Sequence, residues 1–316
     1  MIIELKIITV TLNPCIDMAF YVNTIKLGAL NRAQNCVSSV GSKGINVSRV
    51  LKMLGDQTIA IAFAGGIDGD RLSAYLDIEN IEYEFVKTAA NVRTNVKIIE
   101  DNGIYTEFNQ SGGPINADEK EKMLKQIYKA SADADVLFLG GSVPPGVDKD
   151  IYAEIIKEVK KTAPHLKVIL DCDGEALEKG LKEKPALIKP NQYELSTLCG
   201  KTVETVEEIE KESLKIYEKY NTAVLATMGA DGAVYTGEEG TFKVKAPKIK
   251  AKSAAGAGDT FLSAFLHYKW KRTNDGEKNP QKIVENALIF AASAAAAKVE
   301  KEGTDIPTVD EMKKYI

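Results

Sequence analysis

The chain has 316 residues, of which 44% are apolar and 27% charged, and its 41 basic and 45 acidic side chains give a formal net charge of -4. This length and composition suit one large folded domain rather than a disordered chain. Because no dense run of basic residues is present, we expect no nucleic-acid partner. The most apolar stretch, residues 287–297, is shorter than the ~20 residues of a membrane-spanning helix, so we expect no membrane partner.

The cysteines and the N-terminal segment bear on the cellular compartment. Four cysteines contain no Cys-x-x-Cys pair, which argues against a disulfide framework and a thiolate metal site. Residues 1–6 carry no basic region followed by a long apolar stretch, so no secretion signal is predicted. We therefore expect a cytoplasmic protein with reduced thiols.

Buried strands and amphipathic helices alternate along most of the chain. Strand-like runs without polar alternation, as expected of strands covered on both faces, are found at residues 7–10, 136–139, 168–170 and 223–226. Segments with apolar residues at helical spacing are found at residues 45–54, 118–131, 148–161 and 206–220. This alternation predicts an α/β fold with a parallel sheet.

Two stretches of the N-terminal half depart from this pattern. Residues 18–40 and 91–109 have the polar alternation of half-exposed strands, and Asp101-Asn102-Gly103 is a strong hairpin signal. They predict a small lid sheet contributed by two separate parts of the chain, about residues 13–40 and 88–110. Residues 307–316 are predicted to form a short closing helix.

A glycine-rich turn precedes the predicted buried helix that contains residues 261–266. Gly256, Ala257 and Gly258 would let the backbone approach a polyphosphate, which the free amides of a helix N-terminus bind. Asp259 could then accept the proton of an attacking hydroxyl. Locally, however, an aspartate at a helix start is more often structural. A Walker-type phosphate loop is absent, because Leu195 stands where its first glycine belongs before Gly200-Lys201-Thr202.

Five motifs occur together in one order along the chain. They are Thr11-Leu12-Asn13-Pro14-Cys15-Ile16-Asp17, Gly41-Ser42-Lys43-Gly44-Ile45-Asn46-Val47, Gly141-Ser142-Val143-Pro144-Pro145-Gly146, Lys189-Pro190-Asn191-Gln192-Tyr193-Glu194 and Gly256-Ala257-Gly258-Asp259. In this the chain resembles the ribokinase-like carbohydrate kinases, and most closely their phosphofructokinase branch. The resemblance implies a single kinase domain over residues 1–316, a three-layer α/β/α fold with a mostly parallel central sheet and a lid, and ATP-dependent phosphorylation of a ketohexose monophosphate. It also implies a homodimer formed through the lid sheet.

The resemblance assigns roles residue by residue. Asp259 is the implied catalytic base, with Gly256, Ala257 and Gly258 as the anion-binding turn. The implied sugar-phosphate ligands are Asp17, Arg32, Gly41, Lys43, Asn46, Arg93 and Ser142. Without the resemblance, these would be a turn aspartate, a solvated loop and unremarkable exposed arginines.

On the nucleotide side the implied residues are Lys189, Asn191, Glu194, Thr227, Gly229, Gly232 and Asn286. Asn191 and Glu194 would also organise Mg²⁺ through water, since this ion often keeps several waters. Locally, the same pair fits a helix cap, and Asp231-Gly232 fits a hairpin turn.

The preferred substrate is fructose 1-phosphate, converted to fructose 1,6-bisphosphate, because residues 11–14 and 106–109 resemble that branch. Tagatose 6-phosphate and fructose 6-phosphate remain alternatives, as does a catalytically silent regulator that binds the same ligands. A dinucleotide-binding oxidoreductase is disfavoured, since Asn13-Pro14 replaces the glycine fingerprint after the first strand. The chain departs from the resemblance at Ser42, where relatives have a second glycine, at Ser253-Ala254-Ala255, and at Gly112-Gly113-Pro114.

Overall fold

The computed structural model describes residues 5–274 and 278–316, so residues 1–4 of the N-terminal segment lie outside it. Its centre is a nine-stranded sheet in the order β13-β12-β11-β10-β9-β8-β1-β4-β5. These strands are β1 (Lys6–Thr11), β4 (Gln57–Ala64), β5 (Glu82–Lys87), β8 (Val136–Gly140), β9 (Lys167–Asp171), β10 (Leu187–Ile188), β11 (Ala223–Thr227), β12 (Ala233–Gly237) and β13 (Gly240–Val244). All pairs from β11 to β5 are parallel, and β12 and β13 are added as antiparallel strands. The mostly parallel sheet is confirmed.

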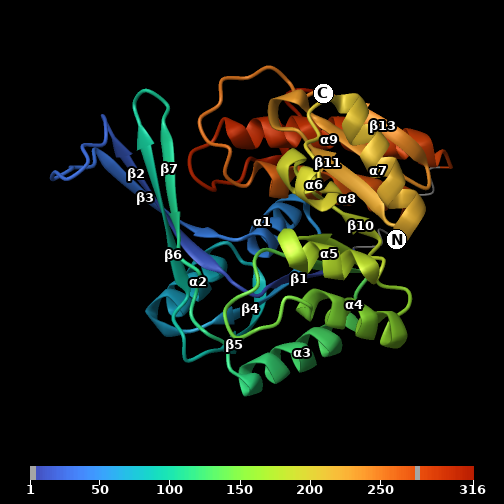
Figure 1. Cartoon of the computed structure of the whole chain (residues 1–316), viewed down its shortest axis with the longest axis horizontal. Helices are drawn as coiled ribbons and strands as arrows, with labels where there is room; N and C mark the ends of the chain where they lie inside the picture. The colour runs from blue at the N-terminus through green and yellow to red at the C-terminus, as the bar shows by residue number, and fades with distance from the viewer. Residues whose placement is uncertain (1–4, 275–277) are drawn as a thin grey trace.

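Helices cover both faces of this sheet (Figure 1). One face carries α3 (Ala117–Ser131), α4 (Ile151–Thr162), α5 (Gly174–Lys182), α6 (Gln192–Cys199) and α7 (Val206–Tyr220). The other carries α1 (Lys43–Leu54), α2 (Gly66–Ile78), α8 (Ala257–Asn274) and α9 (Pro280–Val299). Neighbouring residues of β1 serve the two layers, since Ile7 packs into one core cluster and Ile8 into the other. The three-layer α/β/α architecture is therefore confirmed.

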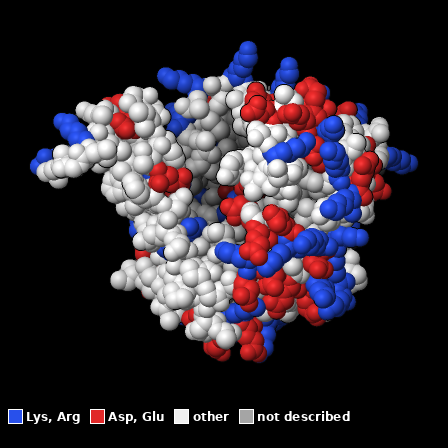
Figure 2. Space-filling model, viewed as in Figure 1, with Lys and Arg blue, Asp and Glu red and all other residues white. Residues whose placement is uncertain are grey.

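A second, smaller sheet stands beside the main body (Figure 1). It has the order β3-β2-β6-β7, with β2 (Cys15–Val22), β3 (Asn35–Gly41), β6 (Arg93–Glu100) and β7 (Tyr105–Asn109). Parallel pairing of β2 with β6 joins the two stretches that the sequence analysis assigned to the lid. We call these four strands the lid sheet. The surface is hollowed between the lid sheet and the main body (Figure 2).

Two predicted helices differ in their limits. The helix predicted from residue 148 begins at Ile151, because residues 146–150 form turns after the two prolines. The closing helix predicted for residues 307–316 is reduced to α10 (Val309–Met312), and the Tyr315 amide instead donates to Ser293 Oγ. No helix in the described part of the chain is both long and apolar enough to cross a membrane.

Candidate active site

The glycine-rich turn opens a helix as predicted. Gly256 has a φ of +74°, which favours glycine, and α8 begins at the next residue. The amides of Ala257 and Thr260 donate to the carbonyls of Ala254 and Gly256. Those of Gly258 and Asp259 have no acceptor among the described residues. Two donors at the positive end of a long helix are therefore free for an anion.

Asp259 lies in the first turn of α8 and is 8% exposed. The Asn46 side chain, from the first turn of α1, donates to Asp259 Oδ2 at 2.8 Å. Burial, followed by the nearby charge of Asp171, raises the pKa of Asp259. Asn46, Lys189 and Lys43 oppose that rise, so the carboxyl lies among groups that favour its ionised form as well.

Asp171 links the two lysines that the sequence analysis had placed on opposite sides of the site. This carboxylate, the last residue of β9, is 2.6 Å from Lys43 Nζ and 3.1 Å from Lys189 Nζ. Although burial opposes ionisation of Asp171, the two ammonium groups outweigh it and hold its pKa below the ordinary value. Lys43 Nζ also lies 3.4 Å from Glu194 Oε1. A β-carbon on Gly258 would be 3.5 Å from Lys189 Nζ, which puts that positive charge beside the turn with the two free amides.

Lys43 thus contacts carboxylates on the predicted nucleotide side of the site. Asn46, on the same helix, donates to the Asp259 carboxylate instead. The sugar-phosphate role that the resemblance implies for Lys43 stays a prediction.

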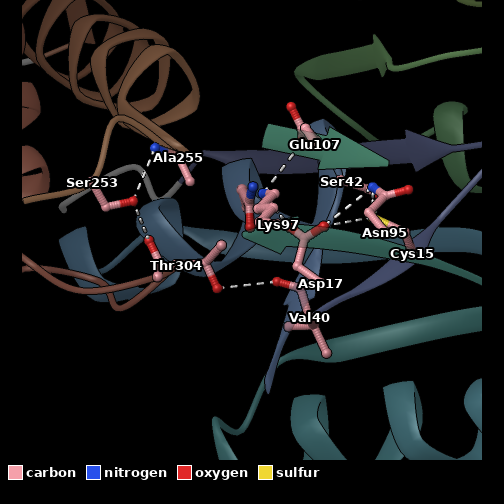
Figure 3. A network of polar contacts seen from close by, with 12 residues as sticks. Cys15, Asp17, Val40, Ser42, Asn95, Lys97, Glu107, Ser253, Ala255 and Thr304 are labelled. Carbon is pink, nitrogen blue, oxygen red and sulfur yellow. Dashed lines mark hydrogen bonds and ion pairs between the residues drawn. The ribbon is translucent and has the colours of Figure 1, made fainter. Parts of the chain in front are cut away.

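A polar cluster at the base of the lid sheet surrounds Asp17 (Figure 3). Lys97 Nζ lies 3.0 Å from Asp17 Oδ2, and Asn95 Nδ2 donates to Oδ1 at 3.2 Å. A β-carbon on Gly41 would lie 2.5 Å from Asp17 Oδ2, so only glycine leaves this carboxylate in place. Burial and the charge of Asp17 raise the pKa of the neighbouring Cys15 thiol to about 12, which keeps the thiol protonated.

Two further predicted substrate ligands lie next to this cluster. Arg93, paired with Cys15 in the sheet register, donates to the carbonyls of Asn13 at 3.2 Å and Gln110 at 2.8 Å. Asn13 in turn donates to Ser142 Oγ at 3.0 Å. The first, second and third motifs therefore meet at this edge of the sheet.

Arg32 is not brought to this group. It lies exposed in the loop between β2 and β3 and forms no hydrogen bond or ion pair within the described chain. Its predicted role would need a partner that approaches this loop.

Asn191 and Glu194 form both halves of a capping box at the start of α6. Asn191 Oδ1 accepts from the Glu194 amide at 2.8 Å, and Glu194 Oε2 accepts from the Asn191 amide at 2.8 Å. Asn191 and Glu194 thus form the helix cap that their local pattern predicts, and Glu194 Oε1 is still directed at Lys43. No group of three metal-ligating side chains occurs in the described part of the chain. This donor set fits a Mg²⁺ ion brought by nucleotide phosphates and solvated by water, rather than one held by the protein alone.

Part of the predicted nucleotide side lines one cavity of about 570 Å³, where Asn191, Thr227 and Gly229 come together. Gly232 has a φ of +99° and lies against the backbone of Val244, so its immediate role is to permit the close approach of β13. Asn286 is half-buried on α9 and is not among the residues that line this cavity.

Sequence reasoning missed Asp171 and Lys97. A signal existed for Asp171, because it ends a buried strand, and carboxyl ends of parallel strands carry the ligand-binding residues of such sheets. Lys97 lies within the alternating stretch 91–109, where the pattern marks it only as a polar residue of a half-exposed strand. Its pairing with Asp17 depends on the parallel register of β2 and β6, which the sequence does not reveal.

A family model described as pfkB family carbohydrate kinase matches residues 10–311. The chain belongs to this family. It is accordingly an ATP-dependent sugar kinase.

Several relatives of this pfkB family chain share most of its length. A 1-phosphofructokinase of Bacillus subtilis is 35% identical over 260 residues, covering 82% of this chain and 84% of the relative. A 1-phosphofructokinase of Vibrio cholerae is 29% identical over 301 residues, covering 95% and 92%.

Solved structures agree with the fold. Phosphofructokinase-2 of Escherichia coli, in complex with substrates and products, has a TM-score of 0.88 at 28% identity and covers 98% of both chains. A ribokinase of Giardia lamblia has a TM-score of 0.83 at 19% identity, which supports the fold alone. The ribokinase-like architecture is confirmed.

Proposed function

We propose that this kinase transfers the γ-phosphoryl group of ATP to the free primary hydroxyl of fructose 1-phosphate, giving fructose 1,6-bisphosphate. The observation that carries this is the pair of unpaired amides at Gly258 and Asp259 beside the buried Asp259 carboxylate. The substrate is chosen because the similar curated proteins are 1-phosphofructokinases.

In the proposed reaction the hydroxyl oxygen of the sugar bonds to the γ-phosphorus, and Asp259 accepts the proton of that hydroxyl. The bond from that phosphorus to the bridging oxygen breaks, and ADP leaves. The amides of Gly258 and Asp259 and the Lys189 ammonium stabilise charge on the transferred group. Asn46 orients the base through its 2.8 Å hydrogen bond.

The sugar would lie under the lid sheet, with its hydroxyls on Asp17. Lys97 offsets the charge of this buried carboxylate, and Arg93 offers a guanidinium to the phosphate that the substrate already carries. The cavity lined by Asn191, Thr227 and Gly229 would receive part of the nucleotide, with Mg²⁺ carried on its phosphates near Glu194.

Fructose 6-phosphate is the second candidate. Phosphofructokinase-2 of Escherichia coli in complex with fructose 6-phosphate has a TM-score of 0.86 at 28% identity over 99% of this chain. Each of the two sugars presents one phosphate and one primary hydroxyl at opposite ends of a ketohexose.

We also propose that this kinase is a cytoplasmic homodimer, and exposed side chains of the lid sheet support the pairing. Several large apolar side chains on its strands and loops are exposed, including Leu27, Leu30, Ile104 and Phe108. Apolar side chains gathered on one projecting sheet suit pairing with a second copy. Arg32, in the same loop as Leu30, would then face that copy.

The test is ADP release with fructose 1-phosphate, fructose 6-phosphate, tagatose 6-phosphate and unphosphorylated fructose. We expect the highest kcat/KM with fructose 1-phosphate, and phosphorus NMR should place the new phosphate on carbon 6. Preference for fructose 6-phosphate or tagatose 6-phosphate would replace the proposed substrate. Preference for fructose itself would remove the phosphate-binding roles of Arg32, Lys43 and Arg93.

A further inference from the structure

Lys298 on α9 is a buried cation that the proposed reaction does not use. Its residue exposure is 0%, and it forms no ion pair within the described chain. Its one acceptor among the described residues is the Gly303 carbonyl, at 2.9 Å from Nζ. An isolated ammonium in the protein interior is costly, and a methionine would fill similar space without that cost. The stability of the fold alone therefore does not explain why a lysine occupies this position.

The Lys298 side chain runs directly beneath the anion-binding turn. A β-carbon on Gly256 would lie 3.5 Å from Lys298 Cε. The Gly303 carbonyl that accepts from Lys298 also accepts from Ser253 Oγ at 3.4 Å, and Ser253 Oγ accepts from the Ala255 amide at 3.3 Å. Three polar contacts thus connect the ammonium to the residue before Gly256.

The Gly303 carbonyl, which accepts both of these hydrogen bonds, belongs to a loop that also contacts other elements of the fold. Thr304 Oγ1 donates to the Val40 carbonyl at 3.2 Å, at the end of lid strand β3 (Figure 3). Arg49, from α1, donates to the Thr304 carbonyl at 2.9 Å. The loop whose Gly303 carbonyl accepts from Lys298 is therefore held by contacts with both α1 and the lid sheet.

The charged groups that surround Lys298 come from four elements. Asp305 of the same loop and Asp259 of α8 favour its ammonium form, whereas Arg49 of α1 and Lys97 of β6 oppose it. Burial is the largest influence and lowers the pKa of Lys298 to about 8. The charge is present at neutral pH and is lost at moderately alkaline pH.

We propose that the Lys298 ammonium is a positioning charge for the Gly256–Asp259 turn. It holds the carbonyl, hydroxyl and amide that orient the free amides of Gly258 and Asp259 toward the transferred phosphoryl group. A small cation from solution takes over this role when the side chain is removed, because carbonyl oxygens accept K⁺ and NH₄⁺ as they accept an ammonium group. The inference rests on the proposed phosphoryl transfer for its kinetic readout only.

The kinetic test compares the parent enzyme with Lys298→Ala in tetramethylammonium, potassium and ammonium chloride at one ionic strength. We expect parent kcat to change less than about twofold, and Lys298→Ala to lose about 10²-fold in tetramethylammonium, comparable to one lost oxyanion donor. K⁺ or NH₄⁺ should restore most of that loss with a saturable dependence, while KM for the sugar phosphate changes little. The control Lys301→Met, which removes a surface ion pair in the same loop, should match the parent. Full activity of Lys298→Ala, or a loss that neither cation relieves, overturns the proposal.

Two further measurements distinguish the proposed role of Lys298 from a wrong choice of substrate and from misfolding of the Lys298→Ala variant. Amide hydrogen exchange of residues 252–262 without substrate should be faster in Lys298→Ala and should slow again with K⁺; unchanged exchange contradicts the proposal. In the parent, kcat should fall as pH rises through about 8, and Lys298→Arg should remove that alkaline limb. If kcat of Lys298→Arg still falls over the same alkaline range, another group is responsible for the titration and the proposed role of Lys298 is refuted.

Discussion

Gly41→Ala is expected to impair sugar binding without affecting ATP binding. Gly41 ends strand β3, and its φ lies outside the left-handed region, so alanine meets no backbone strain there. The obstacle is a steric clash, because the β-carbon of alanine would be 2.5 Å from Asp17 Oδ2 and 2.8 Å from Cys15 Sγ. Both separations are well inside van der Waals contact, so the Asp17 carboxylate must move.

The magnitude follows from what that movement removes. Overpacking a site of this kind costs about 1–3 kcal/mol. A charge-assisted hydrogen bond from a sugar hydroxyl to Asp17 is worth roughly 1.5–3 kcal/mol. At 1.4 kcal/mol per factor of ten, loss of that bond lowers kcat/KM for the sugar phosphate by about 10- to 150-fold.

The assay measures KM for the sugar phosphate and for ATP in Gly41→Ala, Asp17→Ala and the double variant. Cys36→Ala, at an exposed position of the same strand, serves as the control. Because both single changes disable one carboxylate, the double variant should be little worse than Asp17→Ala. An unchanged sugar KM in Gly41→Ala, or losses that multiply in the double variant, would refute the reasoning.

Other consequences can be measured separately. Ser42 has a φ of 107°, so Ser42→Gly should raise the free energy of unfolding by about 1 kcal/mol in urea titrations, and a decrease would contradict the strain. Lys97→Met should raise the sugar KM about tenfold by leaving Asp17 without its counter-charge, while an unaltered KM would deny the pair a role in binding. Because the pKa of Asp259 is raised, kcat should fall on acidification with an apparent pKa above the ordinary ~3.9, and Lys189→Met should move this limb higher; a limb that stays in place excludes the coupling. Because the folded-state pKa of Asp259 is raised, the protein loses stability as the pH rises through that pKa. Asp259→Asn should therefore raise Tm at pH 7, and a lower Tm would contradict the upward direction of the pKa shift.

Much of the fold could be predicted because its signals are local. Buried runs such as residues 136–139 and 168–170 identify a parallel sheet without any long-range information. The hairpin at Asp101-Asn102-Gly103 likewise depends on turn chemistry alone. The short strands β10 and β13 gave no such signal, since strands of this length or exposure are held by their neighbours.

The site was predicted less completely because side chains from distant segments meet there. Asp171 and Lys43 are 128 residues apart, and their 2.6 Å contact depends on the packing of α1 against the sheet. Asn191 and Glu194 show a different limit, because one pair of side chains caps a helix and also directs a carboxylate oxygen toward Lys43. A local pattern cannot separate those two uses.

The role of Asp259 is tested most directly by turnover and ATP affinity in Asp259→Asn, with fructose 1-phosphate as acceptor. General-base catalysis by a positioned side chain contributes about 10²- to 10⁴-fold, and kcat should fall by that factor. The dissociation constant of ATP should stay within about threefold of the parent, because the free backbone amides of the turn remain in the variant. An Asp259→Asn enzyme that turns over at the parental rate would contradict the assignment of Asp259 as the base.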